Sequence, residues 1–206
     1  PEDPPTLADV ARSIDPNCGT ASPDAREAGA LHRLDRTTSG VVAFARTPEA
    51  WAWGRNALAG AWKLYLARAE EVPSTWPPEA DAHVEPDPTP PRWPAGATLP
   101  QPSTPGVRVS WPLLASGPRG HRMRVDARGQ PAASRVWIVD PSRALFAIEL
   151  EGGRRHQIRV HMAALGLPLR GDGLYGDAPP DASVQLHAWA YQLGPQEPVI
   201  VATPPG

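Results

Sequence analysis

Short strand-like segments joined by short turns, between residues 107 and 151, constrain the fold more than any other feature of this sequence. Each is a brief run with alternating or β-branched apolar residues, as expected for strands. Parallel neighbours would need long crossover connections, so these segments are expected to form an antiparallel meander. The predicted strands are Val107–Trp111, Arg122–Asp126, Ala133–Asp140 and Leu145–Glu151, with turns at Gly117–Gly120 and Asp140–Arg143.

Further strands and a few helices are expected on either side of this meander. Strands outnumber helices and do not alternate with them, which indicates the α+β class. A length of 206 residues fits one domain, taken here as residues 1–206. The additional strands are expected at Val41–Ala45, Lys63–Arg68, Ser183–Leu193 and Val199–Ala202, and the helices at Thr6–Ile14, Glu49–Ala61 and His156–Leu165.

Two segments do not fit a regular pattern. Residues 1–30 are expected to be irregular apart from the short helix near their start. Residues 73–105 are dense in proline and carry acidic residues without periodicity. Because proline lacks a ladder donor and interrupts helices, this stretch is expected to be a surface insertion between strands.

Composition narrows the class of protein further. Cys18 is the only cysteine, which excludes an internal disulfide and argues against a cysteine-built metal site. His156 and His161 are five positions apart, which does not match the spacing of a helical zinc site, so no metal is expected. No stretch is apolar enough to span a bilayer and no export signal opens the chain. A cytoplasmic protein is therefore expected.

Positive charge is concentrated locally although the net charge is −2. Arginines gather in residues 33–36, 119–135 and 154–170, and Lys63 is the only lysine. A local basic face can bind phosphates on a nearly neutral protein, and the planar guanidinium suits bidentate phosphate contacts. A GC-rich genome would also produce an excess of arginine.

A single carboxylate stands among cations in LHRLDRTTSG, residues 31–40. Asp35 lies between Arg33 and Arg36, and a Thr-Thr-Ser-Gly turn follows. Flanking arginines favour the ionised form, and an oriented carboxylate can act as a nucleophile or a base. An aspartate that caps a surface turn is the alternative.

A second basic cluster occurs far along the chain in GRRHQIRVH, residues 153–161. On a helix, Arg155 and Arg159 would share a face at i, i+4. The cluster offers phosphate contacts and an ion-pair partner for Asp35, or else it is a solvated helix face. Tyr65, in KLYLA, is expected to share one side of its strand with Lys63 and Ala67, either as a platform for an unstacked base or as a core residue.

These segments resemble the signature motifs of the RluA-type RNA pseudouridine synthases. LHRLDRTTSG resembles HRLDxxTSG, KLYLA resembles KxYxA, and GRRHQIRVHMAALGLPLRGDGLYG resembles a long GRTHQIRVHLAxxGxPxxGDxxYG segment. LHAWAYQL is similar to the family's late strand, and GQPAASRV to GKxAxT. The four main motifs occur in the family's order.

The resemblance implies a mixed, mostly antiparallel sheet with flanking helices and a central catalytic cleft. It implies isomerisation of a uridine in ribosomal or transfer RNA to pseudouridine, with no cofactor. A monomer is the default expectation. Asp35 corresponds to the catalytic aspartate, which attacks the ribose or removes a ribose proton. Further roles implied are Tyr65 stacking on uracil, Arg159 pairing with Asp35, Arg33 filling the gap left by a flipped nucleotide, Ile158 in an apolar wall, and Arg36, Arg154 and His156 contacting the substrate.

Two alternatives stand beside this interpretation. Residues 1–30 hold no counterpart of the strand and Lys-Pro-Ala-Gly-like loop that open the family's catalytic domain. The chain could therefore be an RNA-binding protein on the same scaffold without catalysis. An unrelated sugar- or phosphate-processing hydrolase would need a second acid near Asp35, such as Asp172.

Overall fold

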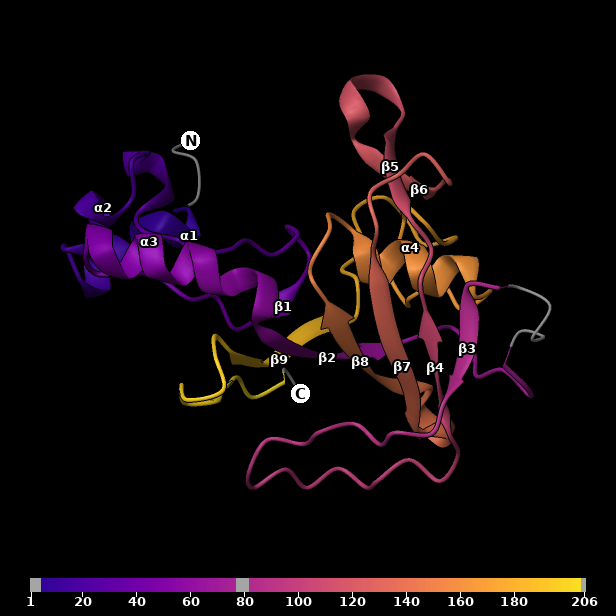
Figure 1. The fold of residues 1–206 in the computed structure, drawn as a ribbon. Helices are drawn as coiled ribbons and strands as arrows, with labels where there is room; N and C mark the ends of the chain where they lie inside the picture. The colour runs from indigo at the N-terminus through magenta and orange to yellow at the C-terminus, as the bar shows by residue number, and fades with distance from the viewer. Residues whose placement is uncertain (1–4, 77–81, 205–206) are drawn as a thin grey trace.

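A mixed eight-stranded sheet forms the centre of the computed structural model, which describes residues 5–76 and 82–204 (Figure 1). The order of the strands is β1-β9-β2-β8-β7-β4-β3, and β10 pairs with β9. Only β1 runs parallel to its neighbour; every other pair in this sheet is antiparallel. The strands are β1 (Ser39–Gly40), β2 (Trp62–Arg68), β3 (Val84–Asp87), β4 (Gly106–Val109), β7 (Ala133–Asp140), β8 (Leu145–Glu151), β9 (Leu186–Gln192) and β10 (Ile200–Val201).

The expected meander is confirmed in three of its four strands. β4, β7 and β8 are antiparallel neighbours, and the fold is α+β as predicted. Residues 122–126 were expected in the same sheet, which was wrong. Instead β6 (Arg122–Val125) pairs with β5 (Leu113–Ser116) in a separate hairpin that projects from the sheet (Figure 1).

The two faces of the sheet are covered by different parts of the chain. An apolar cluster lies on each face of the sheet. Successive strand residues point to opposite faces, so β7 and β8 contribute side chains to both clusters. α4 (Gln157–Ala164) covers the first face through Ile158 and Met162, which pack with Phe146 and Ile148. This face, below called the α4 face, carries the site described in the next subsection.

The proline-rich insertion covers the second face, contrary to the expectation of a plain surface excursion. Trp93, Ala97 and Leu99 pack against the cluster formed by Leu64, Leu66, Trp137, Val139, Ala147, Trp189 and Ala190. The insertion also contains β3, which pairs with β4 at the sheet edge, where Pro86 is tolerated. Residues 77–81 of the insertion lie outside the described residues.

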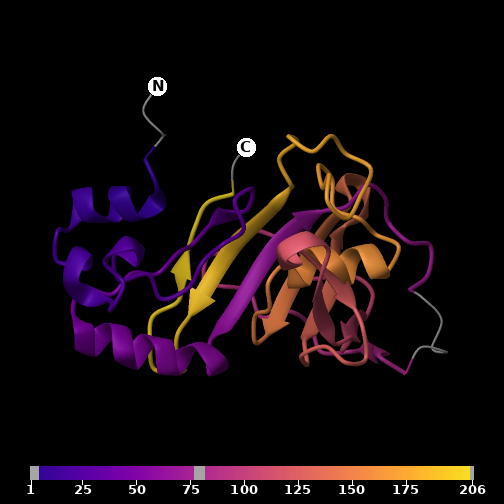
Figure 2. The ribbon, with the colours of Figure 1, turned by 90° about the horizontal axis from the view of Figure 1, so that it is seen from above.

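Helices, not irregular chain, make up much of residues 5–30, which corrects the expectation for this segment. α1 (Leu7–Ile14) is the predicted first helix, and Thr6 and Asp9 form its capping box. α2 (Cys18–Ala21) and η1 (Ala25–Glu27) follow. Figure 2 shows this helical group and α3 (Pro48–Ala57) beside the sheet, next to β9 and β10; η2 (Leu58–Gly60) follows α3 directly.

Residues 41–45 do not form the predicted strand. Their backbone groups bond irregularly: Val41 N–H donates to Ala188, and Ala43 C=O accepts from Leu31 N–H. Only Phe44 makes an isolated bridge, to Ala30. The apolar residues correctly indicated that this segment is buried, since Val41 is 8% exposed. Burial alone does not give a segment the regular hydrogen bonds of a strand.

The described residues contain neither a membrane-spanning helix nor a cluster of metal-binding side chains. In residues 5–76 and 82–204, no helix combines the length and apolar character needed to cross a bilayer. Across the same residues, no cluster of three or more His, Cys, Asp or Glu side chains is arranged to hold a metal ion.

Candidate active site

The loop that carries Asp35 is fixed at its C-terminal end by the sheet. Thr38 N–H donates to the Asp35 carbonyl, which closes a tight turn. β1 follows at once, and Ser39 pairs with His187 of β9, where Ser39 Oγ lies 2.8 Å from His187 Nδ1. Gly40 has φ +118°, and a Cβ there would lie 2.2 Å from the Ala188 carbonyl oxygen, so only glycine fits this close approach.

Arg159 is held rigidly inside the protein by Asp172. Its Nε and Nη2 donate to the two carboxylate oxygens at 2.8 and 2.7 Å, a bidentate pair. Asp172 is fully buried and also accepts from the backbone N–H groups of Leu174 and Tyr175. Burial opposes both charges, but this pairing prevails: the pKa of Arg159 is raised and that of Asp172 is lowered.

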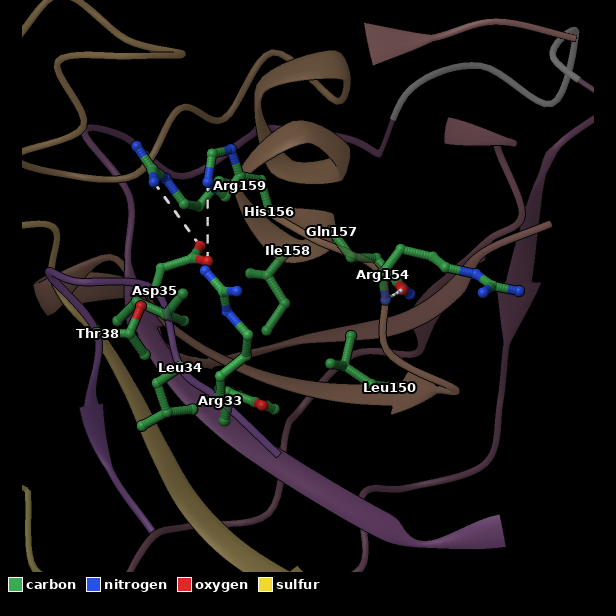
Figure 3. A pocket seen from close by; sticks show the side chains of 12 residues that line it. Arg33, Leu34, Asp35, Thr38, Leu150, Arg154, His156, Gln157, Ile158 and Arg159 are labelled. Carbon is green, nitrogen blue, oxygen red and sulfur yellow. Dashed lines mark hydrogen bonds and ion pairs between the residues drawn. The ribbon is translucent and has the colours of Figure 1, made fainter. Parts of the chain in front are cut away.

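Asp35 faces two nitrogen groups from the start of α4. Its Oδ2 lies 3.7 Å from Arg159 Nη1, and its Oδ1 lies 3.7 Å from His156 Nε2 (Figure 3). The Asp35 side chain is 23% exposed, so these contacts are only partly screened by water. The expected pairing of Arg159 with Asp35 therefore exists as a longer contact, while the short hydrogen bonds of Arg159 go to Asp172.

Tyr65 reaches the same site from β2. The pairing of β2 with β9 shifts register between Leu64 and Tyr65, which marks a bulge. Tyr65 packs against the apolar cluster on the α4 face, to which Ala67 belongs, and it also lines a hollow that contains Asp35. Its role as a stacking platform stays a prediction. Burial, with the charge of Asp35, raises the pKa of Tyr65 to about 12. Its hydroxyl is therefore protonated at neutral pH.

Three hollows meet at the Asp35 loop, with volumes of about 70, 650 and 370 Å³. Arg33 and Asp35 line all three hollows, so their loop forms part of the wall of each. The smallest hollow contains Asp35, Tyr65 and Ile158 together. Its lining, most of which Figure 3 shows, is Arg33, Leu34, Asp35, Thr38, Tyr65, Leu150, Arg154, His156, Gln157, Ile158, Arg159 and Leu186.

The exposed arginines differ in what they contact. Arg33 and Arg36 make no side-chain hydrogen bond or ion pair with the described residues, so both are available to an anion. Arg154 lines the small hollow but donates to the Pro131 carbonyl and points away from Asp35 in Figure 3. Arg155 donates to two carbonyls near the β5–β6 turn.

The helical face expected for Arg155 and Arg159 was wrong. α4 begins at Gln157, and His156 before it is left-handed with φ 54°, so Arg155 lies outside the helix. Sequence reasoning also missed Tyr175, whose hydroxyl lies 2.7 Å from His156 Nδ1, and the pairing of Asp172 with Arg159. Both residues lie in GDGLYG, the end of the long segment that resembles the family's motif. Asp172 was considered only as the second acid of a hydrolase, and Tyr175 was given no role.

Comparison with known proteins matches this site and fold to one family. A family model described as RNA pseudouridylate synthase matches residues 7–164. The chain therefore belongs to the RNA pseudouridylate synthase family.

Curated relatives are similar over most of this chain. "Ribosomal large subunit pseudouridine synthase D" of Yersinia pestis is 31% identical over 158 residues, which are 76% of this chain and 40% of that protein. The protein of the same name from Nitrosomonas europaea is 31% identical over 178 residues, 81% of this chain and 44% of that protein. The chain thus spans about two fifths of the length of these relatives.

Solved structures agree on the fold. "Human RNA Pseudouridylate Synthase Domain Containing 1" superposes with a TM-score of 0.59 at 21% identity and covers 86% of this chain and 68% of that one. "Human RNA Pseudouridylate Synthase Domain Containing 4" also gives 0.59, at 19% identity, with 85% and 71% covered. The sheet with its cleft is therefore the pseudouridine synthase fold that the motifs indicated.

Proposed function

We propose that this chain is an RNA pseudouridine synthase in which Asp35 is the catalytic carboxylate. The observation that carries the proposal is a partly exposed carboxylate between Arg159 and His156, in a hollow that also holds Tyr65. The reaction breaks the glycosidic C–N bond of uridine, turns the uracil and forms a C–C bond. It is an isomerisation, so it needs no co-reactant.

The residues around the hollow support the steps of this reaction. A base must leave the stack before its glycosidic bond can be reached, so the enzyme needs a wedge, a stacking surface and a carboxylate. Arg33 is proposed as the wedge, Tyr65 as the stacking surface and Ile158 as the apolar wall. Asp35 attacks the ribose or removes a ribose proton.

We propose ribosomal RNA of the large subunit as the substrate, with transfer RNA as the second candidate. The names printed for the relatives, from Yersinia pestis and Nitrosomonas europaea, support the first. Arg33 and Arg36 would bind phosphates on either side of the target uridine, with Arg154 and His156 as further contacts. We propose further that residues 1–206 act as one catalytic domain, as a monomer and in the cytoplasm.

The hydrolase alternative needs a second acid near Asp35. Asp172 would have to supply it, but its side chain is fully buried and its oxygens accept from Arg159 and two backbone amides. A carboxylate so occupied cannot reach a substrate proton.

The test is an assay for new pseudouridine in unmodified transcripts of large-subunit ribosomal RNA and of transfer RNA. Wild type, Asp35→Asn and a control, Asp140→Asn, would be compared, with sites mapped by chemical labelling. Asp140 caps η4 (Pro141–Arg143) at the far end of β7, and asparagine caps equally well. Product with wild type and control, but not with Asp35→Asn, is expected. No product from folded wild type that still retains RNA would instead support the non-catalytic RNA-binding protein.

A further inference from the structure

We propose that His156 is a positioning residue for Asp35, and that the Tyr175 hydroxyl holds it in the tautomer with the proton on Nε2. This inference rests on the proposed function. It gives His156 a role other than the RNA contact proposed above, and it gives Tyr175 a role for the first time. Three observations carry it: the hydrogen bonds of Tyr175, the direction in which His156 faces Asp35, and the backbone conformation at His156.

The Tyr175 hydroxyl has two partners among the described residues. Met123 N–H lies 2.8 Å from it, and His156 Nδ1 lies 2.7 Å from it. A backbone N–H can only donate, so the hydroxyl accepts from Met123. Of these two partners, only an unprotonated His156 Nδ1 can accept the hydroxyl's own proton. This arrangement leaves Nδ1 without a proton, and the neutral ring then carries its proton on Nε2.

The other side of the imidazole leads to the same tautomer. Nε2 lies 3.7 Å from Asp35 Oδ1. With a proton on Nε2, an N–H dipole faces the carboxylate and attracts it. With a bare lone pair there, two electron-rich atoms would face each other in a partly buried site, which is unfavourable. Tyr175 and Asp35 thus select one tautomer from opposite sides of the ring.

The backbone at His156 is held in an unfavourable conformation to make this contact. Its φ of 54° lies in the left-handed region, which residues other than glycine rarely adopt. His156 also occupies the N-cap position of α4, yet its side chain makes no capping hydrogen bond. The side chain instead bridges Tyr175 and Asp35. Strain of this kind persists where surrounding contacts require it, and it is frequent at functional sites.

Burial is the main influence on the pKa of His156, and it favours the neutral ring. Burial lowers its pKa most strongly, Arg159 and Arg155 lower it further, and Asp35 and Asp172 oppose them. A neutral ring has one N–H only, so the choice of tautomer decides whether Asp35 receives a donor.

The result is a carboxylate that is oriented from both sides without being blocked. His156 faces Oδ1 and Arg159 faces Oδ2, both at 3.7 Å, which is longer than a hydrogen bond. Asp35 is therefore oriented by attraction while its oxygens stay open to the ribose.

A nuclear magnetic resonance measurement tests the tautomer without relying on catalysis. The full chain, labelled with ¹⁵N-histidine, would be examined at neutral pH, with His156→Gln used to assign the signals. Protonated Nε2 and unprotonated Nδ1 are expected in wild type, and a mixture of tautomers in Tyr175→Phe. A proton on Nδ1, or a mixture in wild type, would overturn the proposal. So would an Asp35→Asn variant that leaves the Nε2 signal unmoved.

Kinetics test the positioning role itself. In His156→Ala, kcat should fall about tenfold, because Asp35 loses one of the two groups that orient it, and KM should stay nearly unchanged. His156→Gln, which can place an amide donor near Asp35, should recover part of the loss. The matched control is His83→Gln, next to β3 at the opposite edge of the sheet. Full kcat in folded His156→Ala would refute the role, as would an increase in KM alone, which would indicate an RNA contact instead.

The two proposals fail in different ways. If wild type makes no pseudouridine, the proposed function fails. The tautomer of His156, and the change of its Nε2 signal in Asp35→Asn, then decide alone whether His156 faces Asp35 as inferred. If wild type is active but the tautomer is wrong, only the role of His156 is refuted.

Discussion

Removing the guanidinium of Arg159 should destabilise the whole fold, and the size of the loss follows from the burial of its partner. In Arg159→Met, the Asp172 carboxylate keeps only the backbone N–H groups of Leu174 and Tyr175. The side chains of the pair are 9% and 0% exposed, so water cannot replace the lost cation. A buried charge left without its partner costs about 3–5 kcal/mol.

That magnitude is large enough to measure by thermal or urea unfolding. For a chain of this length, each kcal/mol shifts Tm by about 2–4 °C, so a fall of about 6–20 °C is expected. The matched control is Arg128→Met, because Arg128 also pairs with an aspartate but is 75% exposed. Exposed pairs contribute at most about 1 kcal/mol, so this variant should stay close to wild type.

A second substitution, Asp172→Asn, tests whether the loss of stability comes from the unpaired carboxylate. Asp172→Asn keeps an oxygen for the two backbone amides but removes the buried charge, so it should stabilise the Arg159→Met background. If Arg159→Met loses less than about 1 kcal/mol, or if the added Asp172→Asn lowers stability further, the buried pair does not support the fold as argued.

Three other outcomes are expected. The pKa of Asp172 is lowered by folding, so its stabilising contribution is complete above the ordinary value of 3.8 and is lost as pH falls through the lower pKa of the folded state. The free energies of unfolding of wild type and Arg159→Met, measured in urea, should therefore converge in strong acid. Gly54→Val should lower the free energy of unfolding by about 1–3 kcal/mol, because even an alanine Cβ would lie 2.6 Å from Leu31 Cδ1; an unchanged urea midpoint would contradict this packing. RNA affinity should fall steeply with added salt, and Arg36→Ala should reduce the slope of log affinity against log salt by about 1; equal slopes would show that Arg36 contacts no phosphate.

Elements with two-sided burial were predictable from the sequence. β2, β7 and β8 alternate between two apolar clusters, and that alternation is visible as a period of two. α4 was predicted because Ile158 and Met162 recur at helical spacing. These signals are local, so they can be recognised before any partner is known.

The features that sequence reasoning missed depend on distant partners. Trp93 packs against Trp189, with their ring centroids 5.7 Å apart. The sequence of the proline-rich segment alone does not predict that contact. Asp172 looks like a loop residue until Arg159 is placed against it. In the candidate site, Asp35, Tyr65 and Arg159 were identified by motif resemblance, while the tertiary structure was needed to find the part played by Tyr175.

The short pairing of Ser39 with His187 also bears on how the protein folds. The hydrogen bond between their side chains joins residues 148 positions apart, and bringing such distant segments together costs loop-closure entropy. During synthesis at the ribosome, the Asp35 turn precedes its anchoring strand by most of the chain, so it cannot be fixed until β9 has emerged. We expect the central strands to form first and the turn to become ordered last, which would keep incomplete nascent chains inactive.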